Sequence, residues 1–96
     1  MIDNLIKEGE SLVSDVQENM GRKFFKSVRF ETWASKAMLY LENYQKGSVV
    51  TEKAKERFKA LDTRTNYSFY QFLLGSLKAS KEFEEFQDAQ AEEYSI

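Results

Sequence analysis

The chain has 96 residues, with 14 basic and 16 acidic side chains, a formal net charge of −2, and no histidine, cysteine or proline. This length predicts one domain over residues 1–96. Without cysteine and histidine, disulfides, Cys/His zinc sites and histidine-based catalytic triads are excluded. The lack of proline and the presence of only four glycines favour helices over a strand-and-turn architecture.

Residues 2–20 predict an amphipathic first helix. Its apolar face contains Ile2, Leu5, Ile6, Leu12, Val13, Val16 and Met20. Gly9 lies within this face, where it either permits a close helix crossing or is simply tolerated. Gly21 ends or bends the helix. Residues 21–27 are expected to form a connection or its last distorted turns, because the pair Phe24-Phe25 does not fit the apolar face of the next helix.

Start and stop signals predict the next two helices. Ser27 is the expected N-cap of a second helix over residues 28–45, and Lys46-Gly47 is a stop signal with a cation in the last turn and glycine just beyond it. Thr51 is the expected N-cap of a short third helix. Glu52 then lies in the first turn, where a negative charge is favourable.

A capping box at Ser68-Phe69-Tyr70-Gln71 predicts a fourth helix from residue 69 to about residue 92. The leucines of its first half share one face, whereas Phe83 and Phe86 lie roughly 100° around the helix. Either different helices of the domain cover these two faces, or the far end contacts another molecule. The predicted fold is therefore all-α, a compact four-helix domain with a short third helix. Its expected core comprises Ile6, Leu12, Val13, Val16, Phe30, Trp33, Ala37, Leu41, Phe58, Leu61, Leu73 and Leu77.

Charge is unevenly distributed along the chain. Residues 1–20 contain five acidic side chains and one basic one, residues 21–81 contain thirteen basic and five acidic ones, and residues 82–96 contain six acidic and no basic ones. Two interpretations are open. The acidic ends fold back and neutralise the basic middle, or the charged segments are binding surfaces.

Two sets of residues are candidate binding sites. Phe83 and Phe86 lie among Glu82, Glu85 and Asp88 on the last helix, a pattern that favours docking on a basic protein surface, and these five are the predicted protein-binding residues. The alternative is nucleic-acid binding, since basic residues interleaved with aromatic ones can follow a phosphate backbone. Its candidate residues are Arg22, Lys23, Lys26 and Arg29.

No pattern in the sequence indicates catalysis. The four glycines are too far apart for a phosphate loop, and the acidic tail lacks the residue order of a calcium loop. We therefore expect no enzyme, no catalytic residue, no cofactor and no metal site. The first residues do not resemble a signal peptide, and no apolar run approaches the length of a membrane span, so a cytoplasmic protein without a membrane partner is expected.

The order of these features over residues 28–80 resembles short helical proteins and N-terminal helical domains of Gram-positive bacteria, their phages and mobile elements. The matching segments are Phe30-Glu31-Thr32-Trp33, Leu39-Tyr40-Leu41, Thr51 through Phe58, and Leu74-Gly75-Ser76-Leu77-Lys78-Ala79. The resemblance carries no assigned activity. It implies a mobile-element setting, in which small acidic proteins are often inhibitors of host defence, anti-CRISPR proteins among them.

From these observations we expect a non-enzymatic protein–protein interaction protein, specifically an inhibitor of a host factor of the phage or mobile-element type. A protein partner is expected, and a homodimer is possible. The alternatives are a nucleic-acid-binding accessory protein that uses the basic central segment, and a homo-oligomerisation module.

Overall fold

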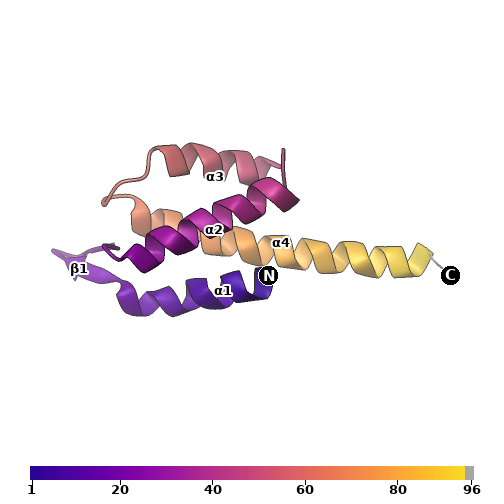
Figure 1. Cartoon of the computed structure of the whole chain (residues 1–96), viewed down its shortest axis with the longest axis horizontal. Coiled ribbons are helices and arrows are strands. Elements are labelled where there is room, and N and C mark those ends of the chain that lie inside the picture. The colour runs from indigo at the N-terminus through magenta and orange to yellow at the C-terminus, as the bar shows by residue number, and fades with distance from the viewer. Residues whose placement is uncertain (95–96) are drawn as a thin grey trace.

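A computed structural model describes residues 1–94, with side chains as far as Asp88. Its elements are α1 (Ile2–Ser11), a 3-10 turn (Leu12–Asp15), β1 (Gln17–Asn19), β2 (Arg22–Phe24), α2 (Val28–Tyr44), α3 (Val49–Lys59) and α4 (Asn66–Tyr94). The fold is thus all-α with four helices, as predicted, and a small hairpin is added. Figure 1 shows that α4 is the longest helix and that its C-terminal half extends beyond the other three.

The predicted first helix is wrong beyond Ser11. After α1 the chain tightens into the 3-10 turn and then becomes extended at Val16. The hydroxyl of Ser14 donates to the Ser11 carbonyl at 3.0 Å. Serine side chains can form hydrogen bonds to the nearby backbone, and these bonds compete with those of a regular helix. The apolar spacing continues to Met20, but Val13 is 64% exposed and Met20 is 98% exposed.

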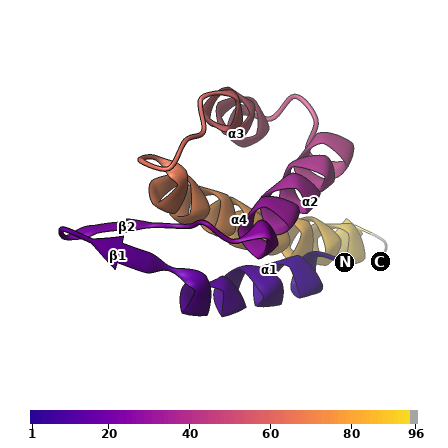
Figure 2. The ribbon, with the colours of Figure 1, turned by 60° about the vertical axis from the view of Figure 1, so that its left-hand side comes forward.

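Residues 17–24 form an antiparallel hairpin that the sequence reasoning missed. Asn19 pairs with Arg22, so the loop has two residues, Met20 and Gly21. Both have positive φ, +53° and +77°, the combination that a type I′ hairpin turn requires. Figure 2 shows the hairpin extending from the body on the same side as the turn between α3 and α4. Gly21 therefore reverses the chain rather than ending a helix.

The boundaries of α2 are close to the prediction. Ser27 caps it, because its hydroxyl accepts a hydrogen bond from the Phe30 N–H at 3.2 Å. Gly47 follows its C-terminus with φ of +80°. The N-cap predicted for α3 is wrong by three residues. The N-cap is Ser48, whose hydroxyl accepts a hydrogen bond from the Thr51 N–H at 3.1 Å. Thr51 is instead fully buried, and its hydroxyl donates to the Gln45 carbonyl at 2.7 Å.

The predicted start of α4 is also wrong, because the helix begins at Asn66 and Ser68 lies inside it. The carboxylate of Asp62 accepts hydrogen bonds from the Arg64 and Thr65 N–H groups, at 2.8 and 3.1 Å, which organises the preceding turn. The Ser68 hydroxyl donates to the Thr65 carbonyl and so caps nothing. The turn organised by Asp62, and not the predicted capping box at Ser68, therefore precedes the first turn of α4.

Asn66 joins the start of α4 to the chain that follows the hairpin. Its side-chain oxygen accepts from the Phe25 N–H at 3.0 Å, and its side-chain nitrogen donates to the Phe25 carbonyl at 2.8 Å. Phe25 is 3% exposed and stacks on Phe30 with ring centroids 4.5 Å apart. A segment predicted as a connection therefore inserts into the core.

An aromatic cluster fastens α1 to the rest of the core. The Trp33 indole N–H donates to the Leu5 carbonyl at 2.7 Å, and the Tyr70 hydroxyl donates to the Gly9 carbonyl at 2.6 Å. A Cβ atom on Gly9 would lie 2.6 Å from Trp33 and 2.9 Å from Leu74. Gly9 therefore permits a close helix crossing, which was one of the two interpretations left open by the sequence.

Seven of the expected core residues are buried: Leu12, Phe30, Trp33, Ala37, Leu41, Leu73 and Leu77. Ile6, Val16 and Leu61 are partly buried against this core. Val13 and Phe58 were wrongly assigned, because the 3-10 turn directs Val13 to solvent and Phe58 packs only one side against Phe69. Phe25, Phe69 and Tyr70, which were not among the expected core residues, are buried in the core.

Candidate protein-binding surface

The C-terminal half of α4 is held to the body along one side only. Lys81 pairs with Asp3 of α1 at 2.6 Å, and this contact lowers the pKa of Asp3 and raises the pKa of Lys81. The hydroxyl of Tyr40 on α2 donates to Glu84 at 2.6 Å. Burial, together with that hydrogen bond, raises the pKa of the Tyr40 phenol, so the phenol remains a donor. These contacts determine which side of α4 faces the body.

The opposite side of the same segment is exposed and apolar. Phe83 is 52% exposed and Phe86 is 60% exposed. Ala79 and Gly75 lie on the same side at helical spacing and are exposed as well. Isolated exposed apolar residues are ordinary on a protein surface, whereas a contiguous set on one helix face indicates an interaction site.

The N-terminal half of this apolar side adjoins α3. The Phe72 ring lies beneath two cations of α3, with Lys53 Nζ 5.6 Å and Arg57 Cζ 4.8 Å from the ring centroid. Val50 shares their side of α3 and is 38% exposed. We call this whole surface the α3–α4 face. It consists of Val50, Lys53 and Arg57 from α3 and of Phe72, Gly75, Ala79, Phe83 and Phe86 from α4.

Charge neutralisation explains the acidic N-terminal segment but not the carboxylates of α4. Four ion pairs connect residues 3–15 to the basic middle: Asp3–Lys81, Glu8–Lys36, Glu10–Lys78 and Asp15–Arg29. Glu82, Glu85 and Asp88 are exposed and form no ion pair with any side chain that the structure describes. The predicted protein-binding residues therefore form a negatively charged, partly aromatic segment whose charges are not matched within the described part of the chain.

The four candidate nucleic-acid-binding residues do not form one surface. Arg29 pairs with Asp15 at 3.4 Å, and Lys23 lies over the Tyr67 ring at 5.5 Å. Arg22 and Lys26 instead line a hollow of about 550 Å³ beneath the hairpin, together with Phe24 and Arg64. Arg64 was missed because it lies 38 residues after Lys26 in the sequence and only the hairpin brings it close.

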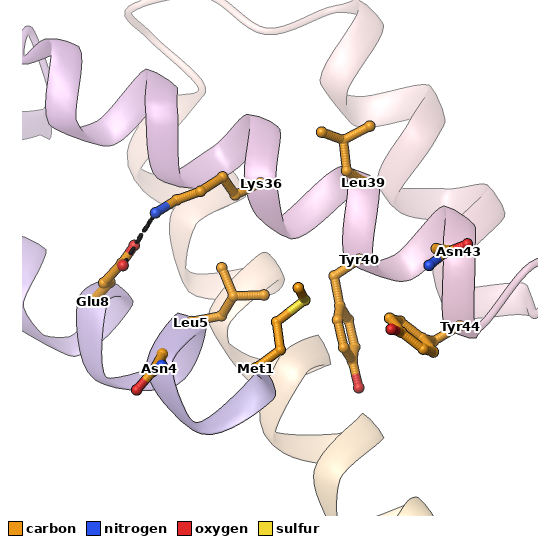
Figure 3. A pocket seen from close by; sticks show the side chains of 9 residues that line it. All are labelled: Met1, Asn4, Leu5, Glu8, Lys36, Leu39, Tyr40, Asn43 and Tyr44. Atoms are coloured by element: carbon orange, nitrogen blue, oxygen red, sulfur yellow. Dashed lines mark hydrogen bonds and ion pairs between the residues drawn. The ribbon is translucent and has the colours of Figure 1, made fainter.

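A second apolar surface lies between α1 and α2 (Figure 3). This groove of about 490 Å³ is lined by Met1, Asn4, Leu5, Glu8, Lys36, Leu39, Tyr40, Asn43 and Tyr44. The Glu8–Lys36 ion pair crosses one end, at 2.8 Å, whereas Tyr40 and Tyr44 stand side by side at the other. Leu39 is 71% exposed in this groove. Its position outside the apolar stripe of α2 is the sequence signal that could have indicated this exposure.

Within the part of the chain that the structure describes, no group of three or more Asp or Glu side chains is placed to hold a metal ion. None of the described helices is both long enough and apolar enough to cross a membrane. Comparison of the chain with family models, with curated proteins and with solved structures gives no match. The arguments for function therefore rest on the surfaces described above.

Proposed function

We propose that this chain is a non-enzymatic protein-binding protein that docks through the α3–α4 face, with Phe83 and Phe86 as the apolar anchors. The observation that carries the proposal is that two phenylalanines, each more than half exposed, lie on a helix that is held to the body from its other side. Buried aromatic anchors supply much of the energy of protein interfaces. Glu82 lies beside these anchors, whereas Glu85 and Asp88 lie further round the same helix, and the negative charge of the three favours a partner with a basic surface.

The setting is part of the same proposal. The resemblance to helical proteins of phages and mobile elements supports an inhibitor of a host factor, of the anti-CRISPR kind. This finer proposal has its own test, because affinity purification of the tagged chain from a Gram-positive host identifies the captured protein by mass spectrometry. A captured component of a defence system supports the inhibitor. Capture of housekeeping proteins alone contradicts it.

The Phe83→Asp variant is expected to lower the affinity of protein association at least tenfold, because the contact would bury a carboxylate against apolar groups. Association is measured both as capture of a partner and as self-association. Helicity by circular dichroism should be unchanged, since Phe83 contributes little to the core. Val28→Asp is the matched control, because Val28 is 75% exposed at the start of α2, away from this face. Retention of all association by Phe83→Asp would contradict the proposal.

The hollow beneath the hairpin favours a second candidate function, binding of single-stranded nucleic acid by Arg22, Lys26 and Arg64 beside the Phe24 ring. Three phosphate contacts predict that affinity falls about 100-fold for a tenfold rise in salt concentration. Fluorescence anisotropy with a labelled oligonucleotide measures this. Arg22→Glu should weaken binding, whereas Lys46→Glu, on the exposed connection after α2, should change it much less. No anisotropy change at low salt would exclude this function.

A further inference from the structure

We infer that the α3–α4 face binds a second copy of the same chain, with the two α4 helices packed side by side in antiparallel orientation. The inference rests on the proposed function, since it names the occupant of the same surface. Most homodimers have two-fold symmetry, so the same residues must serve as both halves of the contact. The α3–α4 face meets that requirement in its spacing, and its charge favours one orientation of the pair.

The spacing of the large and small residues on α4 is symmetric about Ala79. Phe72 and Phe86 lie seven residues to either side of it, and Gly75 and Phe83 lie four residues to either side. With a two-fold axis at Ala79, Phe86 of one copy therefore lies opposite Phe72 of the other. Phe83 lies opposite Gly75 in the same way. The apolar contacts extend about 10 Å in each direction along the helix from the axis.

No contact within the described part of a single copy requires a glycine at position 75. A Cβ atom built on it meets nothing within 4 Å, in contrast to Gly9, where an added Cβ would collide with two side chains. A glycine in a helix interior costs about 1 kcal/mol relative to alanine. Opposite a phenylalanine of a second copy, the missing side chain provides the space that the ring needs.

Charge favours the antiparallel orientation. The exposed carboxylates of α4 lie beyond Lys81, whereas the cations of the face, Lys53 and Arg57, lie beside Phe72. Neither cation forms an ion pair with a carboxylate in the described part of the chain. An antiparallel pair separates the two acidic C-terminal halves and brings each to the same level along the helix axis as the partner's cationic half, which carries Lys53 and Arg57. A parallel pair places the two acidic ends together, which is repulsive.

The sequence contains no cysteine, so single-cysteine variants report the packing directly. Near the two-fold axis, Ala79→Cys is expected to form a disulfide-linked dimer under mild oxidation. Gly75→Cys is the matched control on the same face. In the antiparallel pair its two sulfur atoms are separated by about eight residues of helix, roughly 12 Å, which is too far for a disulfide. In a parallel pair, or in random collisions, both variants would link equally.

Light scattering gives the second measurement. The unmodified chain is expected to have twice the monomer mass of 11.3 kDa at high concentration, and Phe86→Glu is expected to return it to the monomer mass. A monomer that still captures another protein through Phe83 overturns this inference and leaves the proposed function in place. A monomer that captures nothing overturns both. Equal disulfide formation by Gly75→Cys and Ala79→Cys overturns the antiparallel arrangement.

Discussion

Replacement of Asn66 by alanine is expected to lower the free energy of unfolding by about 2–4 kcal/mol. The Asn66 amide is the hydrogen-bond partner of both main-chain groups of Phe25, at 3.0 and 2.8 Å. Phe25 itself is 3% exposed, so its N–H and C=O would be left without a partner away from water. Each such group costs more than the hydrogen bond contributed, because its desolvation is no longer compensated.

Urea unfolding followed by circular dichroism measures this effect. Asn43→Ala is the matched control, because Asn43 is exposed on α2 and makes no side-chain hydrogen bond to another described residue. Its free energy of unfolding should change by less than about 0.5 kcal/mol. If Asn66→Ala were as mild as the control, the connection between the hairpin and α4 would not depend on this side chain.

Gly9→Ala is expected to lower the free energy of unfolding by about 1–3 kcal/mol, although alanine is the better helix former. The new Cβ atom would lie 2.6 Å from the Trp33 ring and 2.9 Å from Leu74. Trp33 cannot easily move away, because it is 2% exposed and its indole N–H is bound to the Leu5 carbonyl. The collision therefore forces α1 away from its neighbours.

Gly75→Ala is the control, for which the free energy of unfolding is expected to change in the opposite direction. An added Cβ meets nothing there, so the free energy of unfolding should rise by up to about 1 kcal/mol through helix propensity alone. Both variants are measured by thermal and urea unfolding in dilute solution, so that self-association does not contribute. Equal effects at the two glycines would contradict the close crossing at Gly9.

The sequence predicts α2 and the fold class well because their signals are local. Ser27 and Gly47 are capping residues whose preferences come from their own backbone geometry. The hairpin was missed because the apolar spacing as far as Met20 also fits a helix, and because Met20, which has positive φ in the turn, is not a residue that usually marks a two-residue hairpin loop. The start of α4 was missed because the Asp62 side chain organises the turn before it. The long-range bonds between Asn66 and Phe25, 41 positions apart, could not be foreseen either.

The candidate site was predictable where helical spacing alone determines exposure. Phe83 and Phe86 were singled out because they lie away from the leucines of α4, and both are exposed. The contribution of α3 could not be foreseen, because it depends on the crossing that brings Lys53 and Arg57 over Phe72. Whether the five predicted residues bind a protein stays a prediction.

The two side-chain bonds to α1 have a mechanical consequence. Helices that touch only through apolar side chains can slide along one another, but Trp33 and Tyr70 each hold a carbonyl of α1, at Leu5 and at Gly9. A shift of α1 by one residue would rotate it by about 100° and break both bonds together. The axial position of α1 is therefore locked, which keeps Asp3 opposite Lys81 where α4 leaves the body.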